Sequence, residues 1–199
     1  TVGPRGRPAP TTSSSTSPAQ VNDGLTITAG NGTGVTDGKL TVKSEANADS
    51  EAIADASTVE EGEADGGTGV GIAVAVNVAN VVNEAILGNG TVHADGGVVQ
   101  ALLADVEGGG RHAFQGEATS GASGSETRVA RSLAINVGIS RTQARIANDA
   151  TVNVTDDGAV EIKAQNTVTN TVKATAKQEG GGSLGVGASI ALNIGETDT

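Results

Sequence analysis

The sequence predicts an all-β repeat domain of the β-solenoid (β-helix-like) type, with three repeats of about 60 residues. Apolar residues alternate with small or polar residues along most segments, which is the pattern of β-strands. Asp-Gly and Gly-Gly turns separate these segments, and similar segments return after roughly 60 residues. These observations together favour stacked repeats, and an antiparallel sandwich is the alternative architecture.

The first residues of the chain differ from the rest. Residues 1–20, "TVGPRGRPAPTTSSSTSPAQ", hold all four prolines among serines and threonines. Low complexity of this kind favours an extended backbone without a packed core. We therefore divide the chain into a Pro/Ser/Thr-rich extended arm or linker, residues 1–20, and a β-strand repeat domain, residues 21–199. A natural place for such an arm is the surface of a neighbouring copy.

Three sets of matching segments define the repeat. The first set is "VAVNVAN", "LAINVG" and "IALNIG", whose asparagines are 59 and 57 residues apart. The second set follows a glycine and consists of "GKLTVKS" from Gly38, "GVVQALL" from Gly97 and "GAVEIKA" from Gly158. The third set aligns residues 25–27, 92–94 and 152–154. Residues 45–65 have a composition that helices also show, but their counterpart at 165–180 alternates as a strand, so we expect strands in both.

The asparagines of the first set always lie among small residues. In these segments the large aliphatic residues occupy one face and Ala, Gly and Asn the other, because successive side chains of a strand point to opposite sides. We expect the bulky face to form the core. For the small face the sequence leaves open close packing against another sheet, a ladder of hydrogen-bonded amides on adjacent coils, or a polar position exposed to water. Because the residue returns once per repeat, we predict that Asn77, Asn136 and Asn193 form a structural ladder rather than a catalytic site.

The composition of the chain disfavours several classes of function. The net charge of −11 disfavours binding to nucleic acid or anionic membranes, and the only aromatic residue is Phe114. The longest apolar run, residues 72–79, contains Asn77 and is too short to cross a bilayer, so we expect no membrane insertion, and no leader-like segment is visible. Absence of cysteine excludes disulfides and thiolate metal sites.

No catalytic, cofactor or metal site is predicted. "GGGSLG" at 180–185 matches a dinucleotide motif in spelling, but a strand-like segment follows where that motif needs a helix. His93 is expected at the outward position held by Thr26 and Asn153 in the other repeats, and His112 has no spaced metal-binding partner. Weak surface Ca²⁺ binding near residues 45–65, which are rich in acidic residues, is the one cofactor hypothesis.

Two long segments, "GVGIAVAVNVANVVNEAILGNGTVHADGG" and "GGSLGVGASIALNIGETDT", carry a family resemblance. They resemble giant bacterial β-strand-repeat surface exoproteins, the filamentous adhesins of the leukotoxin-associated type. The resemblance covers about residues 21–199 and involves repeat-structural motifs. It implies a β-solenoid fold, export, and an extracellular or cell-surface location.

The leading hypothesis is therefore a structural subunit or repeat segment of an extracellular bacterial filament or adhesin. Residues 21–44 are an imperfect version of residues 144–164, so the start of one copy matches what would follow the end of another. This match predicts head-to-tail assembly with other copies of the chain. A cell-surface module that binds host or matrix glycans is the second hypothesis, and a β-helix enzyme that degrades polysaccharides is the third.

Overall fold

The computed structural model of the chain consists of β-strands joined by turns and loops. It describes residues 8–30, 38–56, 68–106, 109–123, 127–155, 158–179 and 184–199. In these residues the chain forms strands and no helix, and every strand pairing is parallel. The predicted all-β class is therefore confirmed, and parallel pairing is consistent with a β-helix-like fold rather than with an antiparallel sandwich.

The longest strands build a four-stranded sheet, here sheet A, in the order β1-β5-β9-β13. Its strands are β1 (Pro8–Val21), β5 (Thr68–Leu87), β9 (Thr127–Ile146) and β13 (Leu184–Asp198). Residues 8–20 of the expected arm are thus extended, and strand β1 pairs with β5 of the same chain along the whole length of β1. Strand β1 continues through residue 20, where the sequence suggested a boundary, and ends at Val21.

Three smaller sheets complete the molecule, and each holds one strand from each repeat. Sheet B contains β2 (Leu25–Thr28), β6 (Gly90–Ala94) and β10 (Thr151–Val154). Sheet C contains β3 (Lys39–Ala46), β7 (Gly96–Leu103) and β11 (Val160–Ala164). Sheet D contains β4 (Asp49–Ala56), β8 (His112–Ser123) and β12 (Val168–Glu179).

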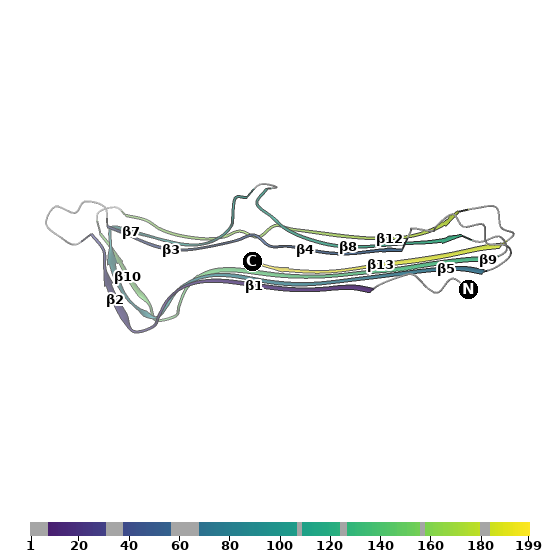
Figure 1. Cartoon of the computed structure of the whole chain (residues 1–199). Helices are drawn as coiled ribbons and strands as arrows, with labels where there is room; N and C mark the ends of the chain where they lie inside the picture. The colour runs from purple at the N-terminus through teal and green to yellow at the C-terminus, as the bar shows by residue number, and fades with distance from the viewer. Residues whose placement is uncertain are drawn as a thin grey trace.

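The sheets form a long, flattened body (Figure 1). Sheet A makes one long layer, sheet B turns the chain at one end, and sheets C and D run back above sheet A. A repeat therefore passes through the four sheets in turn before its successor starts beside it. The strands expected within residues 45–65 are present as the end of β3 and as β4 up to Ala56, and residues 57–65 lie outside the described part.

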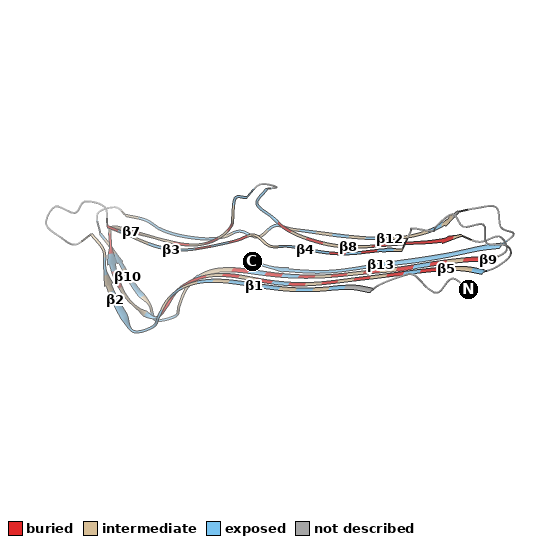
Figure 2. Cartoon of the chain, viewed as in Figure 1, coloured by how far each residue is buried: buried red, intermediate tan, exposed pale blue. Residues whose placement is uncertain are grey.

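The core lies on the small face of sheet A, so the prediction that the bulky face forms the core is wrong. Ala73, Ala75 and Ala134 are buried against alanines of sheet D, including Ala52 and Ala118. The large aliphatic side chains of β5 up to Val78, of β9 up to Ile139 and of β13 point away from sheet D and are partly or largely exposed (Figure 2). Small residues face small residues across the two layers, which keeps the interior thin and leaves no room for the bulky face.

Two glycines show how closely these layers approach. A Cβ atom on Gly71 would lie 1.8 Å from the carbonyl oxygen of Gly121 in β8. A Cβ atom on Gly138 would lie 2.4 Å from both a ring carbon of Phe114 and the side-chain oxygen of Asn170. Any larger residue at either position would push the two sheets apart.

A second core region fills the end of the molecule near sheet B. It contains larger residues, among them Leu87, Val92 and Val99, which come from β5, β6 and β7. The interior is therefore built mainly of alanine between sheets A and D and of Val and Leu near the turn through sheet B.

The repeats stack in a register that differs from the sequence alignment at two of the three sets. His93 pairs with Thr28 and Asn153, whereas the alignment placed it beside Thr26. Gly97 pairs with Leu40 and Val160 rather than with the matching glycines. In both cases the observed pairing is shifted by two residues from the sequence alignment. A shift of two residues leaves every side chain on the same face of its strand, so the alternation of apolar and polar residues could not reveal it.

Candidate functional site

A row of hydrogen-bonded amides crosses sheet A between the two layers. Asn77, Asn136 and Asn193 occupy one register position on β5, β9 and β13. The Nδ2 group of Asn77 donates to Oδ1 of Asn136 at 2.8 Å, and Nδ2 of Asn136 donates to Oδ1 of Asn193 at 2.9 Å. Asn77 and Asn136 are 0% exposed, so these positions are not on a face open to water. Asn193 lies on the outer strand β13 and is exposed.

The same row also joins sheet A to sheet D. The hydroxyl of Ser50 donates to Oδ1 of Asn77 at 2.6 Å, and Nδ2 of Asn77 donates to the Ser50 carbonyl at 3.1 Å. Asn136 Nδ2 lies 3.1 Å from Oδ1 of Asn170 and 3.3 Å from the carbonyl of Phe114. The row therefore connects adjacent repeats within a sheet and the two layers across the core.

A second group of polar residues inside the molecule was not predicted from the sequence. The hydroxyl of Ser44 donates to Oδ1 of Asn83 at 2.6 Å, and Nδ2 of Asn83 donates to the Leu102 carbonyl at 2.8 Å. One repeat further on, the hydroxyl of Ser140 donates to Oδ1 of Asn166 at 3.0 Å. A signal was present, because Asn83 is six residues after Asn77 and so lies on the same face of the strand.

Aspartate side chains tie the turns of different repeats together near sheet B. The carboxylate of Asp95 accepts hydrogen bonds from the Gly38 N–H at 2.9 Å and from the Thr155 hydroxyl. Both hydrogen bonds lower the pKa of Asp95 below its ordinary value, and the bond from the Thr155 hydroxyl has the larger effect. Asp23 similarly accepts from the Asn89 N–H at 2.7 Å. Their partners are in neighbouring repeats, so the Asp-Gly turns fix the stacking as well as the chain direction.

The two histidines occupy very different surroundings. His93 is exposed, and its ring nitrogen lies 3.4 Å from the side-chain amide of Asn153 in the next repeat. His112 is buried at the start of β8, where its ring is stacked with Phe114 at a centroid distance of 6.2 Å. The Ala48 N–H donates to Nδ1 of His112 at 3.0 Å, and burial lowers the pKa of His112.

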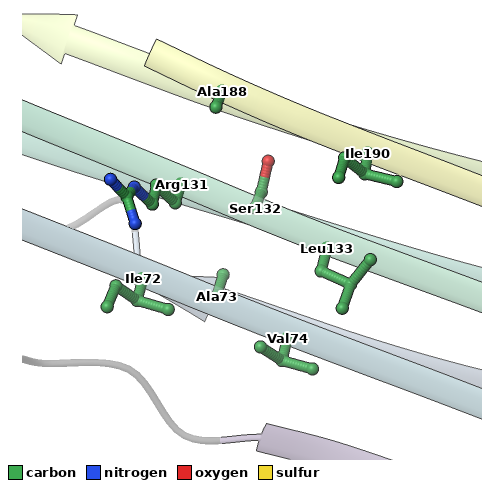
Figure 3. A pocket seen from close by; sticks show the side chains of 8 residues that line it. All are labelled: Ile72, Ala73, Val74, Arg131, Ser132, Leu133, Ala188 and Ile190. Carbon is green, nitrogen blue, oxygen red and sulfur yellow. The ribbon is translucent and has the colours of Figure 1, made fainter. Parts of the chain in front are cut away.

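The outward side of sheet A carries large aliphatic residues in five rows across three strands, here called the aliphatic face. Its members are Val70, Ile72, Val74, Val76 and Val78 of β5, Val129, Leu133, Ile135 and Val137 of β9, and Val186, Ile190, Leu192 and Ile194 of β13, together with Arg131 and Ala188. A shallow hollow of about 170 Å³ lies among residues of this face, and its lining includes Ile72, Leu133 and Ile190, whose side chains Figure 3 shows.

The outward sides of sheets C and D have a different character. They carry ion pairs such as Lys43–Glu45 at 2.7 Å and Lys173–Glu117 at 2.9 Å. Sheet D also presents Glu51 among exposed residues of β4. Sheets C and D are thus charged on their outward sides, whereas sheet A is aliphatic over the five rows of the aliphatic face and charged further along, where Arg141 pairs with Asp198 at 3.4 Å.

Among the described residues, no group of three or more His, Asp or Glu side chains is close enough to hold a metal ion. Residues 57–65 of the acidic segment and residues 180–183 of the glycine motif lie outside the described part of the chain. In the same described part, no helix is long and apolar enough to span a bilayer.

Comparison with known proteins identifies no relative. No protein-family model matches the sequence, and neither a curated protein nor a solved structure matches it significantly.

Proposed function

We propose that the chain is a structural segment of an extracellular bacterial filament or adhesin, built as a flattened β-solenoid in which each repeat is one turn. The observation that carries this proposal is the in-register row of Asn77, Asn136 and Asn193, which gives successive repeats the same amide-to-amide hydrogen bond. Residues that return once per repeat and bond to their own counterparts make each repeat a template for the next.

Elongation in this proposal uses the edges of the sheets. Strand β13 is the outermost strand of sheet A on one side and β1 on the other. The inner-face residues of β13, including Ala191 and Asn193, are exposed, whereas their counterparts Ala134 and Asn136 on β9 are buried. A parallel strand added at β13 would cover them and give Asn193 a neighbour on its open side. A second copy supplies that strand when copies assemble head to tail.

Electron microscopy of the purified chain tests this proposal. The chain is expected to form uniform fibres, and Ala191→Lys is expected to shorten or abolish them, because the new charge would be buried at each junction. In the free chain Ala191 is exposed, so the substitution leaves the fold intact. Gln115→Lys is the matched control, since Gln115 is partly exposed on the outward side of β8, the central strand of sheet D.

Two results would contradict the proposal. One is a chain that stays monodisperse and short at every concentration tested. The other is Ala191→Lys fibres equal in length and number to those of the parent chain.

A further inference from the structure

We propose that the aliphatic face of sheet A is an interface on which a second copy of the chain packs, face against face. This pairing is lateral and independent of strand addition at the sheet edges. It involves a surface that takes no part in the proposed contacts between copies along the filament.

The composition of the aliphatic face supports a buried role. Ile190 is 63% exposed, Ile194 49% and Leu192 46%, although each is a large aliphatic residue. Their neighbours in the same rows are also Val, Ile or Leu, and Arg131 is the one charged member. Monomeric proteins seldom keep such a continuous apolar surface in contact with water.

The area of sheet A suits a partner of the same size. Strands about 4.8 Å apart with about 3.3 Å per residue give the aliphatic face a flat area of about 400 Å². The outward side of the four strands, which are 14, 20, 20 and 15 residues long, covers about 1,100 Å² in total. A stable interface buries about 800 Å² on each partner, with an apolar core and a polar rim. The aliphatic face supplies that core, and the Ser and Thr residues of β1 supply part of the rim.

Charge complementarity favours a two-fold arrangement of identical faces. If the two copies pack with antiparallel strand directions about the row of Ile135, Arg131 of each copy lies over the row of Ile139 of the other. That row also contains Glu196. The cation of each face would thus approach an acidic residue of the partner, and the pairing is self-complementary as a two-fold interface requires. Stacked sheets pack about 10 Å apart in this way.

A lipid surface is a poorer match to this face. Interfacial membrane binding uses Lys or Arg around an apolar surface and Trp or Tyr at its border. The chain has a net charge of −11 and contains neither Trp nor Tyr. The same net charge makes two copies repel at long range, so their pairing should strengthen as salt screens the repulsion.

Sedimentation velocity on the Ala191→Lys chain tests the proposal, because this background suppresses growth at the edges. We expect a dimer that tightens between low and high salt. Adding Ile190→Lys should weaken dimerisation at least tenfold, whereas adding Ile53→Lys on the opposite side should leave it unchanged. Arg131→Glu should also weaken it, and Glu196→Lys combined with Arg131→Glu should restore it.

Three outcomes would overturn the proposal. The Ala191→Lys chain would remain monomeric at all concentrations, or Ile190→Lys would dimerise as well as its parent. The third is binding of the parent chain to neutral phosphatidylcholine vesicles that Ile190→Lys abolishes, which would assign the face to lipid. A parent chain that forms dimers but no fibres would contradict end-to-end growth alone, so the two proposals fail separately.

Discussion

Asn136 shows why a polar side chain belongs in an interior of alanines. Its Oδ1 accepts a hydrogen bond from Asn77, and its Nδ2 group lies within hydrogen-bonding distance of Asn193, Asn170 and the Phe114 carbonyl. A buried amide with these partners holds two sheets and three repeats in one register. Because unpaired buried polar groups cost about 1–3 kcal/mol each, a shift of the stack that breaks the row is strongly disfavoured.

Asn136→Ala should therefore lower the free energy of unfolding by about 2 kcal/mol or more, since it leaves Asn77 and Asn170 without a partner they have now. Asn193→Ala, at the exposed position of the same row, should cost less than about 1 kcal/mol, because water can replace the lost amide. Urea denaturation of both variants measures the difference. Equal losses would show that burial of the amide does not matter.

His112 is the other buried polar residue with a measurable consequence. Its Nδ1 accepts the Ala48 N–H, which requires a neutral ring in this tautomer, and Nε2 has no partner among the described residues. Burial lowers the pKa of His112, and the nearby carboxylate of Asp49 opposes this shift only in part. The folded chain therefore resists protonation of this ring more than the unfolded chain does.

Stability should consequently fall as the pH decreases below the ordinary histidine pKa of 6.5, because the unfolded chain then binds a proton that the folded chain does not. Urea midpoints measured between about pH 7.5 and pH 5 should show this decrease. His112→Gln should remove it, and His93→Gln, at the exposed histidine, should retain it. A decrease that persists in His112→Gln would assign the effect to other groups.

At the scale of single elements, β1 is the least typical strand. Pro8, Pro10 and Pro18 are an even number of positions apart along β1. In a strand, backbone N–H groups at alternate positions point to the same side, so the N–H groups that these prolines lack would all be on one side of β1. Because β1 pairs with β5 along its whole length and proline in sheets points its nitrogen away from neighbours, that side is the open edge. The prolines thus make this edge of sheet A a poor template for further strands.

Pro10→Thr combined with Pro18→Thr should accelerate fibre growth at least about fivefold, since each substitution returns one donor to the open edge. Ser14→Thr, at a position of the same parity that already has its N–H, should change little. Light scattering during assembly measures both rates. Unchanged growth in the double variant would show that the prolines do not restrain strand addition.

At the scale of the whole molecule, the two broad sides differ in the residues that they expose. Small residues between sheet A and sheet D allow the layers to approach closely, and the Val and Leu residues near sheet B fill the wider end. Ion pairs occur on the outward side of sheets C and D, whereas five rows of mostly aliphatic residues occupy part of the outward side of sheet A. The aliphatic face is suited to lateral pairing, while the open edge at β13 is suited to elongation.

The sequence by itself determined the strands, their three-fold repetition and the shared position of the asparagines. Alternation and turns are local properties, and the strands from 39 to 56 appear where residue spacing predicts them. The asparagines align because their segments are long and distinctive enough to define one register.

Only the tertiary structure decided which face is buried. Alternation shows that a strand has two faces, but the identity of the inner one depends on what the opposing sheet presents. Ser50, Ala52 and Gly116 of sheet D offer a small surface, and only the small face of sheet A fits closely against it. The two-residue shifts at His93 and Gly97 have the same origin, since neighbouring strands and turns fix the register where a short alternating pattern fits two ways.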